Sequence, residues 1–168
     1  IQSVDFVSYF TAGMGYAVAK GNPKNVNPDD LCGLNVAVET GTVEEDAINE
    51  TAKQCKADGK KDITVQSSKQ QTDATTAVVT GKADVFFADS PVVGYAIAQT
   101  EGQLEQLGKD FDSVPNAIAI KKGDSQTTDA VQKAMQKLMD DGTYGKILQH
   151  WGVESGALDK AEINPSVD

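Results

Sequence analysis

Apolar residues in the middle of the chain recur in two patterns, whose order predicts strands followed by helices. Three short apolar runs predict strands at 35–39, 63–66 and 83–88. Apolar residues at helical spacing follow each run and predict helices at 43–56, from Ser67 or Ser68 to Gly81, and from Asp89 to about residue 100. The apolar face of the first helix is predicted to consist of Val43, Ala47, Ile48 and Ala52. This β-α-β-α-β-α order is typical of a parallel sheet covered by helices, so we predict an α/β fold.

The patterns on either side of this block are less regular. Two apolar stretches, 4–10 and 14–19, are interrupted by Gly13 and Gly15. Further along, the sequence predicts two short strands, at 104–107 and 117–120, and two helices, at 125–140 and from 143 to about 150. The polar tail from Glu154 is expected to be loosely packed.

The charge balance excludes several classes of partner. All 15 basic residues are Lys, and 25 Asp and Glu residues bring the net charge to −10. Nucleic acids and anionic membranes both require concentrated positive charge, so neither is expected as a partner. A single His, His150, cannot build a His-rich metal site, and no complete nucleotide-binding glycine motif is present. The sequence therefore predicts no metal and no cofactor.

Two cysteines, Cys32 and Cys55, allow two interpretations. A strand–helix unit could bring Cys32, before the strand at 35–39, close to Cys55, near the end of the following helix. A disulfide between them would indicate an extracytoplasmic compartment. The alternative is two buried free thiols in a cytosolic protein.

Residues 41–45 begin the first helix of the block and have two interpretations. Gly41 lets the backbone approach a ligand closely, and the amides of Thr42 and Val43 lie at a helix N-terminus, which favours anions. The same residues also form an ordinary capping box, with Thr42 as the N-cap and Glu45 three residues later. The negative charges of Glu44 and Glu45 oppose a bound carboxylate.

Asp89 ends a buried strand at the start of another helix. It could accept hydrogen bonds from a ligand ammonium, or it could simply cap the helix that begins with Ser90-Pro91. Ligands of open parallel sheets bind beyond the carboxyl ends of the strands, and both this junction and the one at Thr42 belong to that edge. An amide group for a carboxylate beside a carboxylate for an ammonium would suit an α-amino acid.

Motifs along the chain carry a family resemblance. They are Val4-Asp5-Phe6 with Tyr9 or Phe10, Val18-Ala19-Lys20-Gly21-Asn22, Asp30-Leu31-Cys32-Gly33, Gly41-Thr42, Gly81-Lys82-Ala83-Asp84, Asp89-Ser90-Pro91, residues 117–124, Asp141-Gly142-Thr143-Tyr144 and Trp151-Gly152. With these motifs the chain resembles the polar amino-acid family of extracytoplasmic solute-binding proteins that serve ABC importers. The cysteine pair and Glu162-Ile163-Asn164-Pro165 are similar to members from high-GC Gram-positive bacteria.

The resemblance implies two α/β lobes joined by two crossing strands, the type II periplasmic-binding-protein fold. Residues 1–13 would end the first lobe and form the first hinge strand, 14–112 would be a complete second lobe, 113–116 the second hinge, and 117–168 the return to the first lobe. The expected hinge residues are Tyr9, Phe10, Pro115 and Asn116. The chain resembles an N-terminally truncated member, so the family's Arg, a secretion signal and a lipid anchor would precede Ile1.

The resemblance also implies a ligand site in the second lobe. Thr42 and the amide of Val43 would receive the α-carboxylate, with Gly41 in the same turn, and Asp89 would receive the α-ammonium. Glu39 would either read the ligand side chain or lie at the rim of the site.

The function implied is binding without catalysis, so no catalytic residue is assigned. Binding of a polar or basic amino acid would close the two lobes, and the closed form would deliver the ligand to the membrane permease. The protein would work outside the cytoplasm. One alternative is a cyclohexadienyl or arogenate dehydratase of the same fold, which needs a general acid over the substrate ring. Another is the ligand-sensing domain of a membrane receptor.

Overall fold

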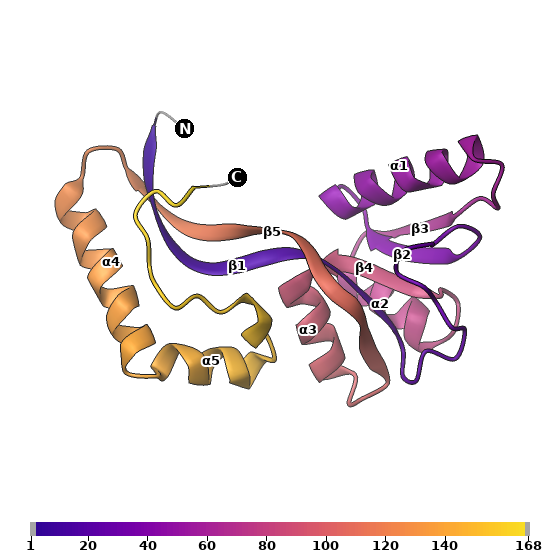
Figure 1. Cartoon of the computed structure of the whole chain (residues 1–168). Coiled ribbons are helices and arrows are strands. Elements are labelled where there is room, and N and C mark those ends of the chain that lie inside the picture. The colour runs from indigo at the N-terminus through magenta and orange to yellow at the C-terminus, as the bar shows by residue number, and fades with distance from the viewer. Residues whose placement is uncertain (1–2, 167–168) are drawn as a thin grey trace. The chain divides into compact units, whose positions relative to one another are not determined.

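The computed structural model of the chain describes residues 3–166, which form two compact units. Unit 2 is Met14–Phe111, and unit 1 combines the residues up to Gly13 with those from Asp112 onward. Two long strands, β1 (Val4–Ala19) and β5 (Leu104–Lys121), each contribute to both units (Figure 1). Residues 1, 2, 167 and 168 of the predicted lobes lie outside the described residues.

The two long strands correct the prediction of shorter segments. Gly13 and Gly15 do not interrupt β1, and the predicted strands at 104–107 and 117–120 are parts of the single strand β5. A Cβ on Gly15 would lie 3.1 Å from Oδ1 of Asp110 on β5. A glycine inside a strand often marks such a close approach, so Gly15 makes room for a neighbour without ending the strand.

The sheet is mixed and has the strand order β3-β2-β4-β1-β5. Strand β2 (Asn35–Glu39) is parallel to β3 (Thr64–Ser68) and to β4 (Val85–Asp89), whereas β1 is antiparallel to β4. The predicted α/β class is confirmed, and the three strands of the predicted alternating block are parallel, as expected.

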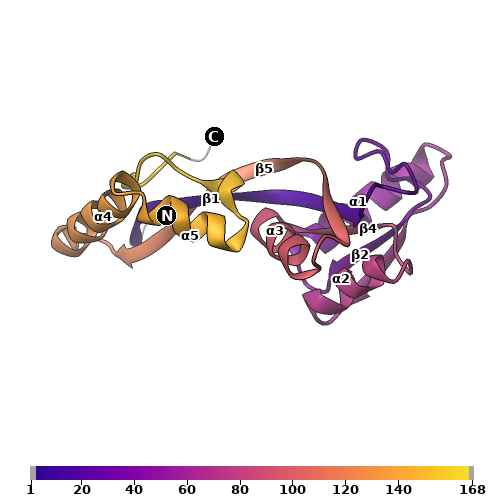
Figure 2. The ribbon, with the colours of Figure 1, turned by 90° about the horizontal axis from the view of Figure 1, so that it is seen from below.

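Helices cover both faces of the sheet in unit 2. Helix α1 (Val43–Ala57) packs on the face that carries Val38 and Phe87. Helices α2 (Gln71–Val79) and α3 (Ser90–Gln99) pack on the opposite face, which carries Ala37 and Phe86 (Figures 1 and 2). The two hydrophobic clusters follow from the alternation of side chains along β2 and β4.

Helix α2 begins at Gln71 and not, as predicted, at Ser67 or Ser68. Both serines belong to β3, where Ser68 pairs with Glu39 of β2. The parallel pairing with β2 therefore extends the strand through residues that resemble helix caps in sequence.

Cys32 and Cys55 form a disulfide with a Cα–Cα distance of 5.7 Å, as predicted. The bond joins the loop before β2 to the C-terminal part of α1. An ion pair between Lys60 and Asp30, with an N–O distance of 3.2 Å, connects the same two segments. Both links hold the C-terminal end of α1 in place.

Unit 1 contains the outer parts of β1 and β5, helices α4 (Ser125–Asp140) and α5 (Thr143–Trp151), and a short 3-10 helix, Glu154–Gly156 (Figure 1). Both α-helices lie close to their predicted positions. The core of the unit consists of two small groups, one around Val7, Ile120 and Ala161 and the other around Phe10, Ala12 and Leu148.

The C-terminal tail is packed, which corrects the expectation of a loose segment. Ser8 N–H donates to Glu162 O at 2.9 Å, and Asn164 N–H donates to Phe6 O at 2.8 Å. Ala161 is only 1% exposed. The tail is held by backbone pairing to β1, which a polar sequence does not reveal.

Gly156 tests this packing. A Cβ at this position would overlap the ring of Phe10 and the carbonyl oxygen of Thr11. We expect Gly156→Ala to lower the free energy of unfolding by about 1–3 kcal/mol, measured by urea denaturation. In the control Gly145→Ala, on α5, a Cβ would meet nothing within 4 Å, so this variant should be equally or more stable than the wild type. Equal stability of Gly156→Ala and the wild type would contradict the packed tail.

Candidate functional site

The candidate site lies at the edge of the sheet where β2 and β4 end. Because these two strands are parallel neighbours, with Val36 opposite Val85, their carboxyl ends meet at one edge. Helix α1 starts just beyond β2, and helix α3 starts directly after β4. The starts of both helices therefore lie at the edge where ligands of such sheets bind.

The turn before α1 resembles a capping box, except that Glu45 binds the amide of Gly41 and not that of the N-cap residue Thr42. Thr42 Oγ1 accepts a hydrogen bond from Glu45 N at 3.2 Å and donates one to Glu39 O at 2.9 Å. Glu45 Oε2 in turn accepts from Gly41 N at 2.7 Å, and this bond, together with one from Ser67, lowers the pKa of Glu45. The Thr42 hydroxyl and the Gly41 amide are thus used inside the turn. Among the first amides of α1, Glu45 N donates to Thr42 Oγ1 and Glu44 N bonds to its own carboxyl, whereas the amide of Val43 needs a partner from outside the helix.

Asp89 occupies the N-cap position of α3 but does not cap the helix. Its side chain makes no capping hydrogen bond, and Pro91 in the first turn removes one of the donors that a cap would serve. Asp89 is also exposed. The carboxylate is consequently available to a ligand, which the interpretation as a simple cap does not provide.

Glu44 is a site residue that the sequence analysis did not select. The residue is only 4% exposed, and its Oε1 is buried without a hydrogen-bond partner. Burial raises the pKa of Glu44, and the negative charge of the adjacent Asp89 raises it further, against a hydrogen bond from its own amide. The structure therefore places two carboxyl groups together at the edge of the sheet.

The helical pattern contained a signal for Glu44. The buried residues of α1 are Glu44, Ile48 and Cys55, whereas Val43, assigned to the apolar face, is 68% exposed. Glu44 lies four residues before Ile48 and so belongs to the buried stripe. A charged residue at a buried position of a stripe is uncommon and indicates a special environment.

The structure separates Glu39 from this acidic pair. Side chains alternate along β2 and β4, so Glu39 shares the face of Ala37, which α2 and α3 cover. Asp89 shares the face of Phe87, which α1 covers. Glu39 and Asp89 therefore project from opposite faces of the sheet.

The predicted hinge residues all lie in unit 1, inside the two long strands. In β1, Tyr9 is 38% exposed and Phe10 is buried at 7%. In β5, Pro115 and Asn116 are half-buried. Their role as hinges remains a prediction.

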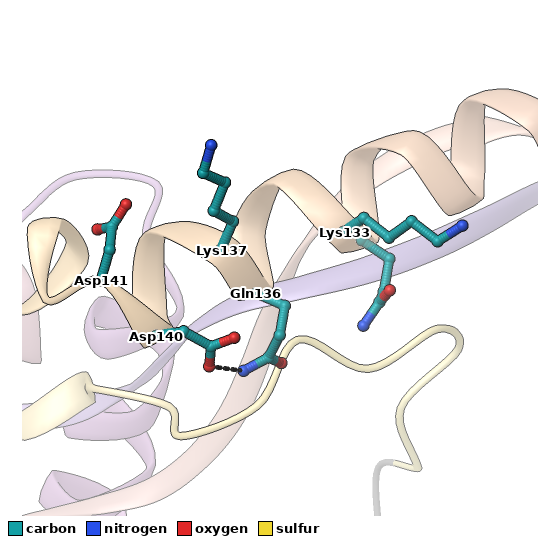
Figure 3. A pocket seen from close by; sticks show the side chains of 6 residues that line it. Lys133, Gln136, Lys137, Asp140 and Asp141 are labelled. Carbon is teal, nitrogen blue, oxygen red and sulfur yellow. Dashed lines mark hydrogen bonds between the residues drawn. The ribbon is translucent and has the colours of Figure 1, made fainter.

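A further hollow of about 380 Å³ lies along α4 of unit 1 (Figure 3). Its lining includes Lys133, Lys137 and Asp141, and a hydrogen bond of 2.9 Å joins Gln136 Nε2 to Asp140 Oδ1. The two lysine side chains extend away from that hydrogen bond, so the charges do not converge on one point.

Within residues 3–166, no cluster of three or more His, Cys, Asp or Glu could hold a metal ion. None of the helices in the same range is long and apolar enough to cross a membrane.

Comparison with known families decides where this chain belongs. Residues 1–154 match the family of bacterial extracellular solute-binding proteins, family 3. The chain is a member of this family.

Two curated relatives of this family member bind amino acids, according to their names. The chain is 38% identical over 164 residues to the arginine-binding protein ArgT of Corynebacterium glutamicum. It is 27% identical over 157 residues to the ABC transporter glutamine-binding protein GlnH of Bacillus subtilis. The matches cover 97% and 93% of this chain but 54% of each relative, so the chain spans about half the length of these relatives.

A solved structure supports the fold of this family member. The ancestral cationic amino acid solute-binding protein AncCDT-1 matches 90% of the chain, which covers 63% of that protein, with 29% identity and a TM-score of 0.76. A second structure of AncCDT-1 describes it as an amino-acid-binding protein and a precursor of cyclohexadienyl dehydratase, with 30% identity, the same coverage and a TM-score of 0.64. The comparisons confirm both the predicted family and the predicted fold class.

The capping box gives a prediction about Thr42. Thr42→Ala removes the hydroxyl that accepts from Glu45 N and should lower the free energy of unfolding by about 1 kcal/mol, measured by urea denaturation. Thr42→Ser keeps the hydroxyl and should stay close to the wild type. If Thr42→Ala were as stable as Thr42→Ser, the hydroxyl would not be serving as a cap.

Proposed function

We propose that the chain acts in the ligand-binding component of an amino-acid ABC importer and binds a polar or basic α-amino acid. The observation that carries the proposal is the carboxylate of Asp89, which makes no capping hydrogen bond and lies at the same sheet edge as the N-terminus of α1. A carboxylate and a helix N-terminus are complementary to the two charged groups of an α-amino acid.

Each group at the edge has a role in this proposal. The amide of Val43 receives the α-carboxylate, assisted by the positive end of the α1 dipole. Thr42 and Gly41 position that amide through the capping box. Asp89 receives the α-ammonium, and its exposure permits direct contact. Glu39 projects from the other face of the sheet, which favours a place at the rim over contact with the ligand side chain.

The relatives support the class of ligand and the setting. ArgT and AncCDT-1 are named for arginine and for cationic amino acids, and GlnH for glutamine. Membership of an extracellular solute-binding family supports a place outside the cytoplasm, where the disulfide would persist. We further propose that ligand capture closes two lobes, that the closed form docks on the permease, and that a lipid anchor holds the protein at the membrane.

A dehydratase is the second candidate, because AncCDT-1 is described as a precursor of such an enzyme. A dehydratase needs a general acid, and a carboxyl with a raised pKa such as Glu44 would suit that role. However, the exposed carboxylate of Asp89 makes no capping hydrogen bond and suits the ammonium group of an amino acid. This position favours a binding protein.

Calorimetry with the full-length protein and a panel of amino acids tests the proposal. We expect one class of amino acid to bind tightly, and we expect Asp89→Asn to weaken its binding by about 2–5 kcal/mol, because the ammonium loses its ionic partner. The control Asp73→Asn removes an exposed carboxylate from the first turn of α2 in the same unit and should leave affinity unchanged.

Three results would each refute the proposal. They are an absence of binding by every amino acid tested, wild-type affinity in Asp89→Asn, and turnover of a cyclohexadiene acid such as arogenate.

A further inference from the structure

We propose that Glu44 is a proton-exchanging selectivity residue of this site. Paired with Asp89, it holds a proton when the site is empty or occupied by a neutral amino acid, and it releases that proton when an amino acid with a cationic side chain binds. The inference rests on the proposed function, because it places the ligand next to Asp89.

The first argument is the position of Glu44. It lies in the first turn of α1 and points inward with the buried stripe of that helix, above the face of the sheet that carries Phe87 and Asp89. The buried Oε1 has no hydrogen-bond partner. A buried polar atom without a partner is costly and indicates a group that the unliganded structure leaves unsatisfied.

The second argument is the balance of charge around the pair. None of the ion pairs formed within residues 3–166 involves Glu44 or Asp89. The charge that acts on Glu44 is that of Asp89, and burial together with this charge raises the pKa of Glu44. A buried carboxyl beside a second carboxylate resists ionisation unless a compensating cation is present.

Among the described neighbours of this edge, the lysines are exposed. The titratable side chains there include Glu39 at the end of β2, Glu45 and Asp46 on α1, Tyr16 on β1 and Asp110 on β5, with Lys69 after β3 and Lys109 on β5 as the lysines. The Glu45 carboxylate accepts a hydrogen bond from the amide of Gly41, and Asp110 Oδ1 accepts one from Gln106 Nε2 at 2.7 Å. Lys69 is exposed, and β3 itself carries no titratable side chain.

The exchange follows from these charges. In the proposed exchange, the two carboxyl groups share one proton in the empty site, so the pair carries one net negative charge. The α-ammonium of a neutral amino acid balances that charge, and the proton stays. A lysine or arginine ligand brings a second positive charge, which replaces the proton; the proton passes to solvent and the total charge is conserved. The substrate class selected is therefore the dibasic amino acids.

Proton counting by calorimetry tests the exchange. The full-length protein is titrated with arginine and with glutamine in buffers of different ionisation enthalpy, over a range from weakly acidic to neutral pH. Cation binding lowers the pKa of Glu44 from its raised value in the empty site. Arginine should then release up to about one proton per site, and its affinity should rise with pH until it levels off above the pKa of the empty site. Glutamine should release none.

Substitutions assign the proton to Glu44. Glu44→Gln keeps the shape of the side chain and should abolish the proton release. It should also lower the affinity for arginine about tenfold to a hundredfold and leave the affinity for glutamine unchanged. Glu50→Gln, on the exposed side of α1, is the matched control and should behave as the wild type. The inference is wrong if arginine and glutamine release the same number of protons, or if Glu44→Gln retains the release.

A ligand-free measurement separates this inference from the proposed function. Carboxyl NMR of the full-length protein should find that Glu44 titrates above its ordinary range and moves toward that range in Asp89→Asn. An ordinary titration of Glu44 would overturn the inference even if amino acids bind. Binding of no amino acid would overturn the proposed function, whatever the titration of Glu44.

Discussion

The parallel pairing of β2 with β4 is the contact on which the candidate site depends. It brings the ends of two strands, and hence the starts of α1 and α3, to one edge of the sheet. The register also determines the face of the sheet from which each side chain projects. A register shift of one residue in β4 would move Asp89 to the face covered by α2 and α3 and away from Glu44. Buried residues on both faces, such as Val38, Phe86 and Phe87, hold the register, because a slip would exchange their environments.

The two units differ in how completely they bury their apolar residues. In unit 2, helices close both faces of the sheet over two extended clusters. Unit 1 has two small clusters and carries most of the large apolar side chains that are exposed, namely Tyr9, Val114, Ile118, Leu138, Ile147, Trp151 and Ile163. The candidate site residues all belong to unit 2. The part of the protein that positions them is therefore also the part with the more complete core.

Local periodicity predicted most of unit 2, and long-range pairing explains what it missed. The helices after β2 and β4 were predictable because apolar spacing and caps are local signals. The continuity of β1 through Gly15, the extension of β3 through Ser68 and the docking of the tail on β1 depend on residues distant in sequence. The turn around Thr42 and the position of Asp89 were predicted as a site, whereas Glu44 was not, because its importance lies in its proximity to Asp89, which is distant in sequence.

The acidic pair also changes how the lack of arginine in this chain bears on ligand binding. In the proposed site, which has no guanidinium clamp from this chain, a backbone amide at a helix N-terminus holds the ligand carboxylate and contributes a partial charge only. The adjacent Glu44 would oppose that carboxylate if it were ionised. In the proposed exchange, a protonated Glu44 avoids this repulsion when a neutral amino acid binds, and a dibasic ligand offsets it with its own positive charge. The same buried carboxyl that costs stability in the absence of ligand thus makes the edge electrostatically compatible with both ends of an amino acid.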